Sequence, residues 1–210
     1  MTRFATWLVV SAVLIGCQNQ THPVFSPAPS PTPHTAPTAA ILQSGDVPQT
    51  LSVCLGSGPI DVYIATLAGS GTPVADKATS AWAQLINEGA RAGAISIFAS
   101  STTSCSAELG STTNAKSIAS VVAQFGDEGE ADRAWQSGVF GFAPPPAGEL
   151  VPGLTRGPST GLGLSSFTYD RPSVRLASWR RSVFVALVVA GNLDLNTFKA
   201  ATAAIDPRLN

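Results

Sequence analysis

The amino-acid sequence predicts an α+β fold, with a largely antiparallel sheet of about five strands and about four helices. Hydrophobic residues make up 44% of the 210 residues and charged residues only 12%, which supplies enough apolar material for a substantial core. Apolar residues recur with a helical period in some segments and with the period of two typical of strands in others. Three short apolar segments near the C-terminal end follow one another across tight turns, as antiparallel strands do.

Prolines mark the beginnings of the first two predicted helices, because proline fits the first helical turn. The first helix opens at Ser57-Gly58-Pro59, and one of its faces carries Ile60, Ile64 and Leu67. The second begins at Thr72-Pro73 and ends before Gly89. Its apolar stripe consists of Val74, Ala78, Trp82, Leu85 and Ile86.

The pattern then changes to two strands and a third helix. We expect strands over residues 94–99 and 117–125, which are mostly apolar. The helix after them has four carboxylates in its first turns, where negative charge complements the helix dipole: Asp127, Glu128, Glu130 and Asp132. Carboxylate oxygens also suit Ca²⁺, but the group lacks the spacing of a known calcium loop, so a solvated helix start is favoured.

Residues 138–161 form a proline- and glycine-rich excursion, and Pro144-Pro145-Pro146 argues against regular structure there. Three antiparallel strands are expected after it, over residues 162–169, 174–179 and 182–189. The last of these is apolar at nearly every position, which predicts a central strand covered on both faces.

A closing helix is expected over residues 195–205, with Asp194 as its N-terminal cap. The strand, glycine and polar turn at residues 121–127 are echoed at residues 186–192, and a helix follows each copy. This repetition indicates two pseudo-equivalent halves of an α+β sandwich.

The N-terminal residues have the composition of a signal peptide. Arg3 supplies one positive charge, and the run over residues 4–16 is apolar apart from two hydroxyl residues. Such a run is too short for a permanent membrane-spanning helix, which needs about 20 apolar residues. The stretch Leu14-Ile15-Gly16-Cys17 resembles the lipobox of bacterial lipoproteins. The resemblance implies that residues 1–16 are removed and that Cys17 carries acyl chains such as palmitate; a plain secretory peptide with an incidental cysteine is the alternative.

Residues 17–41 are expected to be a lipidated N-terminus and spacer, and residues 42–210 a single domain. Prolines recur through the spacer among Ser, Thr and Ala, at Pro23, Pro27, Pro29, Pro31, Pro33 and Pro37. Such a segment cannot bury apolar surface and favours extended polyproline geometry. Docking of this segment in an aromatic groove of a partner is an alternative role.

Two cysteines remain besides the lipidation site, Cys54 and Cys105. An exported protein meets conditions that permit a disulfide, and closing this loop would contribute about 4 kcal/mol on the chain-entropy model. Two buried free thiols or a redox pair are the alternatives, although redox enzymes use a shorter Cys-x-x-Cys spacing. The sequence therefore predicts one disulfide.

The predicted order of elements resembles the extracellular sensor-type α+β domains of actinobacterial lipoproteins and kinases. Those domains pair a disulfide with strand-to-helix units. The resemblance concerns the order of elements alone, so it implies a binding role and carries over no catalytic residue.

Catalysis is limited by the scarcity of histidine, since His22 and His34 are the only two and both lie in the predicted spacer. Residues 157–161 match the Gly-x-Ser-x-Gly pattern of serine hydrolases, but that motif needs a preceding strand, a following helix and usually a histidine base. A serine–lysine variant would have to recruit a lysine, and no spacing points to Lys77, Lys116 or Lys199. We therefore expect no catalytic residue.

Metals, cofactors and nucleic acids are disfavoured as well. The two remaining cysteines are better used together than as zinc ligands. Gly157, Gly161 and Gly163 precede a predicted strand rather than a helix, so they do not form a phosphate cradle. Removal of the signal peptide takes Arg3 from the twelve basic residues, which leaves a net charge of −2 against thirteen acidic ones. Nothing in that balance indicates binding to nucleic acid.

A possible binding patch lies on the predicted hairpin of the last two strands. Alternation places Arg175 and Trp179 on one face, and Arg180 and Arg181 follow directly. Arginine with tryptophan suits an anionic glycan, a lipid headgroup or a protein partner, through bidentate hydrogen bonds and stacking. The alternative is that Trp179 fills the core while the arginines solubilise the turns.

Together these features predict a lipid-anchored protein of the cell membrane or outer envelope, facing away from the cytoplasm. Its domain would bind or sense an unknown ligand without catalysis, with the membrane and an envelope protein or glycan as partners. The alternatives are a histidine-independent hydrolase of cell-wall polysaccharide and a structural envelope protein. Two carboxylates about 5 to 10 Å apart in a cleft would favour the hydrolase. An exposed apolar or basic patch on a closed core would favour the binding module.

Overall fold

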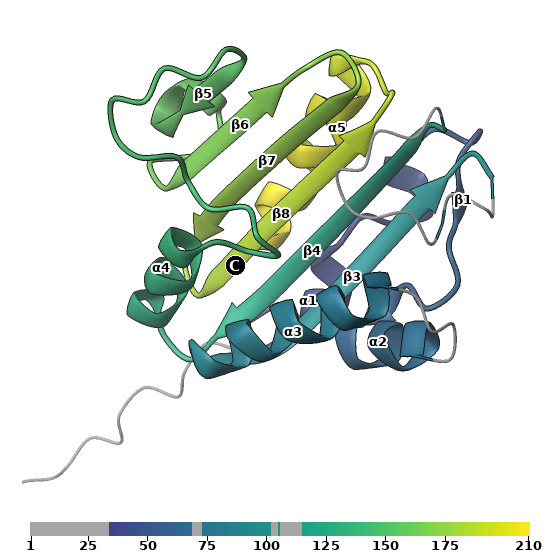
Figure 1. Ribbon diagram of the computed structural model, residues 1–210, viewed down its shortest axis with the longest axis horizontal. Helices are drawn as coiled ribbons and strands as arrows, with labels where there is room; N and C mark the ends of the chain where they lie inside the picture. Colours follow the sequence, from purple (N-terminus) through teal and green to yellow (C-terminus); the bar gives the residue numbers. More distant parts are fainter. Residues whose placement is uncertain (1–33, 69–72, 102–104, 106–114) are drawn as a thin grey trace, which may run out of the picture. The chain divides into compact units, whose positions relative to one another are not determined.

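The computed structural model centres on one antiparallel sheet, and it describes residues 34–68, 73–101, 105 and 115–210 (Figure 1). In sheet order the strands are β1 (Ser52–Val53), β3 (Ala90–Ala99), β4 (Ser117–Phe125), β8 (Phe184–Gly191), β7 (Val174–Arg181), β6 (Ser166–Asp170) and β5 (Leu154–Arg156), and β2 (Gly58–Pro59) pairs with β3. The helices of the described part are α1 (Pro37–Ala40), α2 (Ile60–Ala68), α3 (Pro73–Asn87), α4 (Glu128–Ser137) and α5 (Leu195–Ile205). The predicted α+β class and antiparallel sheet are confirmed.

Both faces of the sheet are covered, and each face has its own hydrophobic core. Helices α2, α3 and α4 lie on the front face, and α1 and α5 lie on the back face (Figure 1). Alternation along β7 divides its side chains, because Leu176 belongs to the front core and Trp179 to the back core. β8 lies between β4 and β7 and is buried from Phe184 to Ala190, which confirms the predicted central strand.

Side-chain caps explain where α4 and α5 begin. The Asp127 carboxylate accepts a hydrogen bond from the Glu130 amide at 2.8 Å, and the Glu130 carboxylate accepts one from the Gly126 amide at 2.9 Å. The Asp194 carboxylate accepts a hydrogen bond from the Thr197 amide at 2.9 Å. These bonds satisfy amides that a helix start leaves open, and they confirm Asp194 as a cap.

The structure corrects the sequence-based prediction in three respects. The sheet has eight strands rather than about five, because β1, β2 and β5 contain only two or three residues and show no alternation. The proline-rich excursion does contain regular structure, namely β5 and a 3-10 helix over Gly157–Thr160. Helices α4 and α5 pack on opposite faces, so the repeated strand-to-helix pattern does not mark two equivalent halves.

The folded part begins before the predicted boundary at residue 42. α1 falls within the predicted spacer, and both Ala40 and Ile41 are buried in the back core. Ala40 and the apolar residues after it pack on the back face of the sheet. The prediction of an extended spacer considered the prolines of this segment and overlooked these apolar residues. The predicted domain boundary at residue 42 therefore lies too far along the chain.

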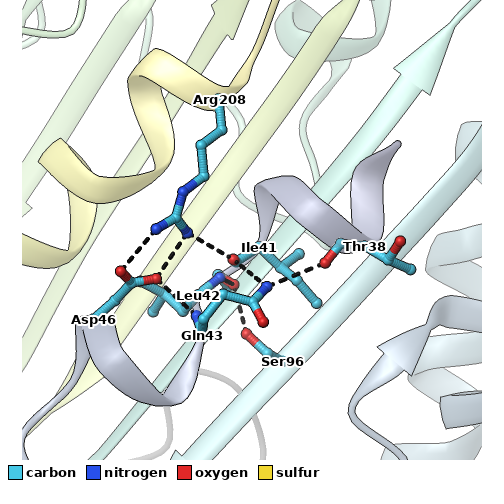
Figure 2. A network of polar contacts seen from close by, with 8 residues as sticks. Thr38, Ile41, Leu42, Gln43, Asp46, Ser96 and Arg208 are labelled. Carbon is cyan, nitrogen blue, oxygen red and sulfur yellow. Dashed lines mark hydrogen bonds and ion pairs between the residues drawn. The ribbon is translucent and has the colours of Figure 1, made fainter. Parts of the chain in front are cut away.

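A polar network attaches this segment to the sheet and to the C-terminal end of the chain (Figure 2). The Asp46 carboxylate accepts hydrogen bonds from the two terminal nitrogens of Arg208 at 2.7 and 2.8 Å, an arrangement that we call the Asp46–Arg208 clamp. The Leu42 amide donates to the Ser120 hydroxyl at 3.0 Å, and this hydroxyl is 2.8 Å from that of Ser96. Hydrogen bonding to Arg208 holds the pKa of Asp46 below its usual range.

Candidate functional site

The front face carries a cavity between α3 and the turn that follows α4. We call it the α3 cavity, and its volume is about 230 Å³. Most of its wall is apolar, as is usual for small-molecule sites. Its lining residues come from α2, α3 and the turn after α4: Tyr63, Val74, Lys77, Ala78, Ala81, Phe140 and Phe142.

The turn that closes this cavity has an unusual backbone. Val139 and Phe142 exchange backbone hydrogen bonds of 3.3 and 3.0 Å, and the two residues between them have positive φ angles of 51° at Phe140 and 83° at Gly141. Two consecutive positive φ angles are typical of a type I′ turn, whose first central position is normally occupied by Asn, Asp or Gly. A phenylalanine there is strained by about 1 to 2 kcal/mol. Such strain is concentrated at functional sites, so this turn is a candidate for a binding role.

A second cavity lies beyond the turn, over β5, β6 and β7. We call it the β6 cavity; its volume is about 490 Å³, and it shares Phe142 with the α3 cavity. Of its described lining residues, Tyr169 alone carries a hydroxyl group, and the others are apolar. The other lining residues are Pro145, Val151, Leu154, Phe167, Val174 and Leu176.

Specific contacts hold the proline-rich loop over the β6 cavity. Arg156 donates hydrogen bonds to the backbone carbonyls of Pro145 and Glu149. Gly153 has a φ of +85°, and a Cβ atom there would lie 2.3 Å from the carbonyl oxygen of Asp170. Only glycine fits this approach of the loop to β6, so the lip of the cavity depends on it.

Two polar side chains line the α3 cavity. Tyr63 is only 4% exposed, and burial raises the pKa of its hydroxyl, which therefore stays protonated as a hydrogen-bond donor at neutral pH. Lys77 brings an ammonium group to the same wall and also lines an adjoining outer hollow of about 470 Å³. Asp76, Ser80 and Gln84 also line that hollow. The α3 cavity thus combines a mostly apolar lining with two polar side chains among its described residues.

The predicted binding patch does not form a common surface. Trp179 is fully buried in the back core, which matches the alternative interpretation of the sequence. Arg175 Nε lies 2.8 Å from the Asp170 carboxylate, and Arg181 pairs with a carboxylate after α5. Arg180 instead pairs with carboxylates of α4 on the front face. Strand alternation sends only Arg180 to the front face. Arg175, Trp179 and Arg181 share the back face, where Trp179 is buried and the two arginines pair with separate carboxylates.

The Gly-x-Ser-x-Gly segment is a surface element. The proline- and glycine-rich composition predicted no strand before this motif, but the three-residue β5 precedes it. The motif itself forms a 3-10 helix and β6 follows, whereas a hydrolase would have an α-helix there. Ser159 is exposed, while Thr160 binds the buried Ser166 hydroxyl at 2.7 Å and closes the loop. His34 lies in the folded part rather than in a spacer, with its ring edge-on to Phe184 at 5.8 Å.

The acidic group at the start of α4 serves the fold. Asp127 and Glu130 are caps, and the Asp132 carboxylate lies 3.1 Å from Arg180 Nε. Across the described ranges, no cluster of three or more His, Cys, Asp or Glu residues could hold a metal ion. The predicted role of this group as a helix start is the one that the contacts support.

Cys54 and Cys105 form the predicted disulfide, with their Cα atoms 5.5 Å apart. Cys54 belongs to the front core, so the bond attaches the long β3–β4 connection next to α2. Cys17 and the rest of the lipobox lie outside the described residues. Among the helices of the described part, none combines the length and apolar character needed to cross a membrane.

Sequence reasoning missed the residues of both cavities, although one signal was present. Phe140 and Phe142 are aromatic residues in a segment otherwise rich in glycine and proline, where nothing local requires large apolar side chains. Their role becomes clear only when α2 and α3 are placed against them. No known protein family, no curated protein and no solved structure matches this chain.

Proposed function

We propose that this protein is a lipid-anchored lipoprotein of the cell envelope whose folded domain binds a small ligand on its front face without catalysis. The observation that carries the binding role is the α3 cavity, a pocket with a mostly apolar lining that includes Tyr63 and Lys77 and with a strained turn at its wall. The lipobox-like stretch ending at Cys17 supports the anchor and the position outside the cytoplasm.

The anchor and the site would be separated by a short tether. Two or more acyl chains on Cys17 make attachment stable, because each buried methylene contributes about 0.8 kcal/mol. With folded structure from residue 34, a polyproline tether of residues 18–33 would span about 50 Å at about 3.1 Å per residue. The domain would thus reach ligands in the envelope near the membrane surface, in keeping with an envelope protein or glycan as neighbour.

The contacts favour binding over the hydrolysis of a polysaccharide. Glycosidases place two carboxylates about 5 to 10 Å apart on either side of the scissile bond. Among the described residues, no carboxylate side chain lines the α3 or the β6 cavity, and Asp76 is the one that lines the outer hollow. A wall of phenyl rings and methyl groups instead suits the body of an apolar ligand.

Native mass spectrometry of protein purified from envelopes tests the binding role. We expect a bound small molecule in the wild-type protein and its loss in Ala81→Trp, whose indole would fill the α3 cavity. Ile86→Trp is the matched control, because Ile86 lies on the same helix, is half exposed and lines none of the hollows described above. Equal retention of the bound mass by both variants would contradict the site.

The anchor has its own test. Mass spectrometry of the mature N-terminal peptide should show acyl chains on Cys17, and labelled palmitate should be incorporated into the wild-type chain but not into Cys17→Ser. An unmodified cysteine at this position would remove the anchor from the proposal and leave the cavity unaffected.

A further inference from the structure

The β6 cavity has a cationic side chain at its rim, from the hairpin that joins β6 to β7. We propose that this cavity binds an amphiphilic organic anion, a small molecule with an apolar body and one oxyanion group such as a carboxylate, and that Arg171 and Tyr169 bind its head. The site is distinct from the α3 cavity that carries the proposed function, so the inference goes beyond that function.

The hairpin fixes Arg171 on the front face of the sheet. Arg171 and Val174 exchange backbone hydrogen bonds of 3.1 and 3.2 Å, so only two residues form the turn between them. This pairing places the Arg171 side chain beside that of Val174, and strand alternation places it on the same face as that of Tyr169. Val174 and Tyr169 both line the β6 cavity. Arg171 therefore stands at the end of the cavity nearest the hairpin turn.

Arg171 contacts Tyr169 and keeps most of its donors available. Its Nε donates to the Tyr169 hydroxyl oxygen at 3.0 Å, and its guanidinium carbon lies 5.5 Å from the centre of the Tyr169 ring. Among the described residues, no carboxylate pairs with Arg171, and the adjacent Asp170 pairs with Arg175 at 2.8 Å instead. The two terminal nitrogens of Arg171 and the Tyr169 hydroxyl hydrogen thus remain as donors for an oxyanion.

The rest of the cavity suits an apolar body with few polar groups. Its volume of about 490 Å³ lies within the range of about 300 to 1,000 Å³ found for small-molecule sites. Apart from Tyr169, its described lining residues are apolar, and Phe142 and Phe167 add aromatic rings. A sugar or a peptide there would leave polar groups unpaired, at a cost in affinity for each. A molecule with one charged group can instead place that group at Arg171 and bury the remainder.

The position of Arg171 limits the cost of binding a charge. Its side chain is exposed at the rim, so an oxyanion held there keeps part of its contact with water. A fully buried ion pair would have to compensate for the loss of hydration of both groups. The body of the ligand can therefore enter the cavity while its head stays at the surface.

Two fluorescent probes that differ in one group test the proposal. Anilinonaphthalene sulfonate has an apolar aromatic body and one sulfonate, and phenylnaphthylamine has the same body without the sulfonate. Both probes become strongly fluorescent in apolar sites. The protein is the chain from residue 17 with Cys17→Ser, because acyl chains would require detergent, whose micelles bind both probes.

Arg171→Gln should weaken binding of the sulfonate about threefold at low salt, leave the neutral probe unchanged, and lose its effect at high salt. Tyr169→Phe should also weaken the sulfonate about threefold, because one hydrogen bond to the head is lost, and leave the neutral probe unchanged. Arg133→Gln is the matched control, since Arg133 is exposed on α4 and lines neither cavity. It should change the binding of neither probe.

Substitutions that fill a cavity locate the probe. Val151→Trp should remove the sulfonate binding that depends on Arg171, because its indole would fill the β6 cavity. Leu164→Trp should keep that binding, since Leu164 is 83% exposed and lines neither cavity. Ala81→Trp should keep it too, because Ala81 lines the α3 cavity. Circular dichroism spectra and urea midpoints that match the wild type would show that each variant is folded.

Three results would overturn the inference. Unchanged binding of the sulfonate in Arg171→Gln would show that this arginine only solubilises the hairpin. Equal weakening of both probes would show that it acts through the shape of the site. Loss of the sulfonate in Ala81→Trp but not in Val151→Trp would place the probe in the α3 cavity. A failure of the proposed function is a separate result, in which Ala81→Trp and Ile86→Trp both keep the mass that copurifies from envelopes.

Discussion

Asp46→Asn should lower the free energy of unfolding by about 2 kcal/mol. The change keeps the size of the side chain and removes the charge that receives the two Arg208 hydrogen bonds of 2.7 and 2.8 Å. Hydrogen bonds to charged groups contribute about 1.5 to 3 kcal/mol each when buried, whereas an exposed ion pair contributes at most about 1 kcal/mol. The two side chains are 13% and 30% exposed, so the pair falls between these limits. With a urea dependence of about 2 kcal/mol per molar, the unfolding midpoint should fall by about 1 M.

The direction in which the free energy of unfolding changes with pH shows whether the charge on Asp46 causes the loss of stability. Because the pKa of Asp46 is lowered in the folded protein, the clamp contributes fully above the unfolded pKa of about 3.9 and is lost as pH falls through the folded pKa. Urea titrations followed by tryptophan fluorescence should show a constant difference between wild type and Asp46→Asn from pH 6 to 8. That difference should vanish toward pH 2. Asp76→Asn, at an exposed site on α3, is the control and should change stability by less than about 0.5 kcal/mol. A difference that persists undiminished at pH 2 would refute the electrostatic reasoning.

Three further substitutions test the fold. Replacing Cys54 and Cys105 by serine should lower stability by about 4 kcal/mol, because the bond closes a separation of 51 residues, and added reductant should then have no effect on the unfolding of the variant. Gly153→Ala should lower the free energy of unfolding in urea by more than about 2 kcal/mol and weaken the binding of ligands in the β6 cavity. Gly161 also has a positive φ but open space around it, so Gly161→Ala should lower the free energy of unfolding by only about 1 kcal/mol. Similar losses in the two variants would contradict the steric argument. Gly93→Ala should lower the midpoint of thermal unfolding, because its Cβ atom would lie 2.7 Å from the indole of Trp82 on α3. A midpoint within one degree of the wild type would show that the Trp82 side chain moves aside without cost.

The long elements with clear end signals were predictable from the sequence. The bounds of α3, β4 and α5 match the prediction because each has a local sequence signal: a proline at the start of α3, mostly apolar residues in β4, and the Asp194 cap of α5. β3 begins four residues before its predicted start at residue 94. Residues 90–93 are Ala-Arg-Ala-Gly, which include no β-branched or aromatic side chain, and they form a strand by pairing with β4.

The candidate site was not predictable because its parts are far apart in the chain. Tyr63 lies on a helix buried as part of the front core, and a periodicity argument assigns such a residue to packing alone. The turn containing Phe140 was hidden in a segment whose composition indicates a loop. Trp179 shows the same limit for a buried residue. Alternation predicts its face of the strand correctly, but its burial depends on the back core against which it packs and could not be predicted from the strand alone.

The division of the sheet into two separate cores has a mechanical consequence. In the proposed anchored form, a force applied at the N-terminal end would pass first into the segment of residues 37–51, whose buried apolar side chains belong to the back core. Tension from an anchored N-terminus would therefore load the contacts behind the sheet before it reached the cavities in front. In that form, a ligand on the front face and a load on the proposed anchor would act on different cores.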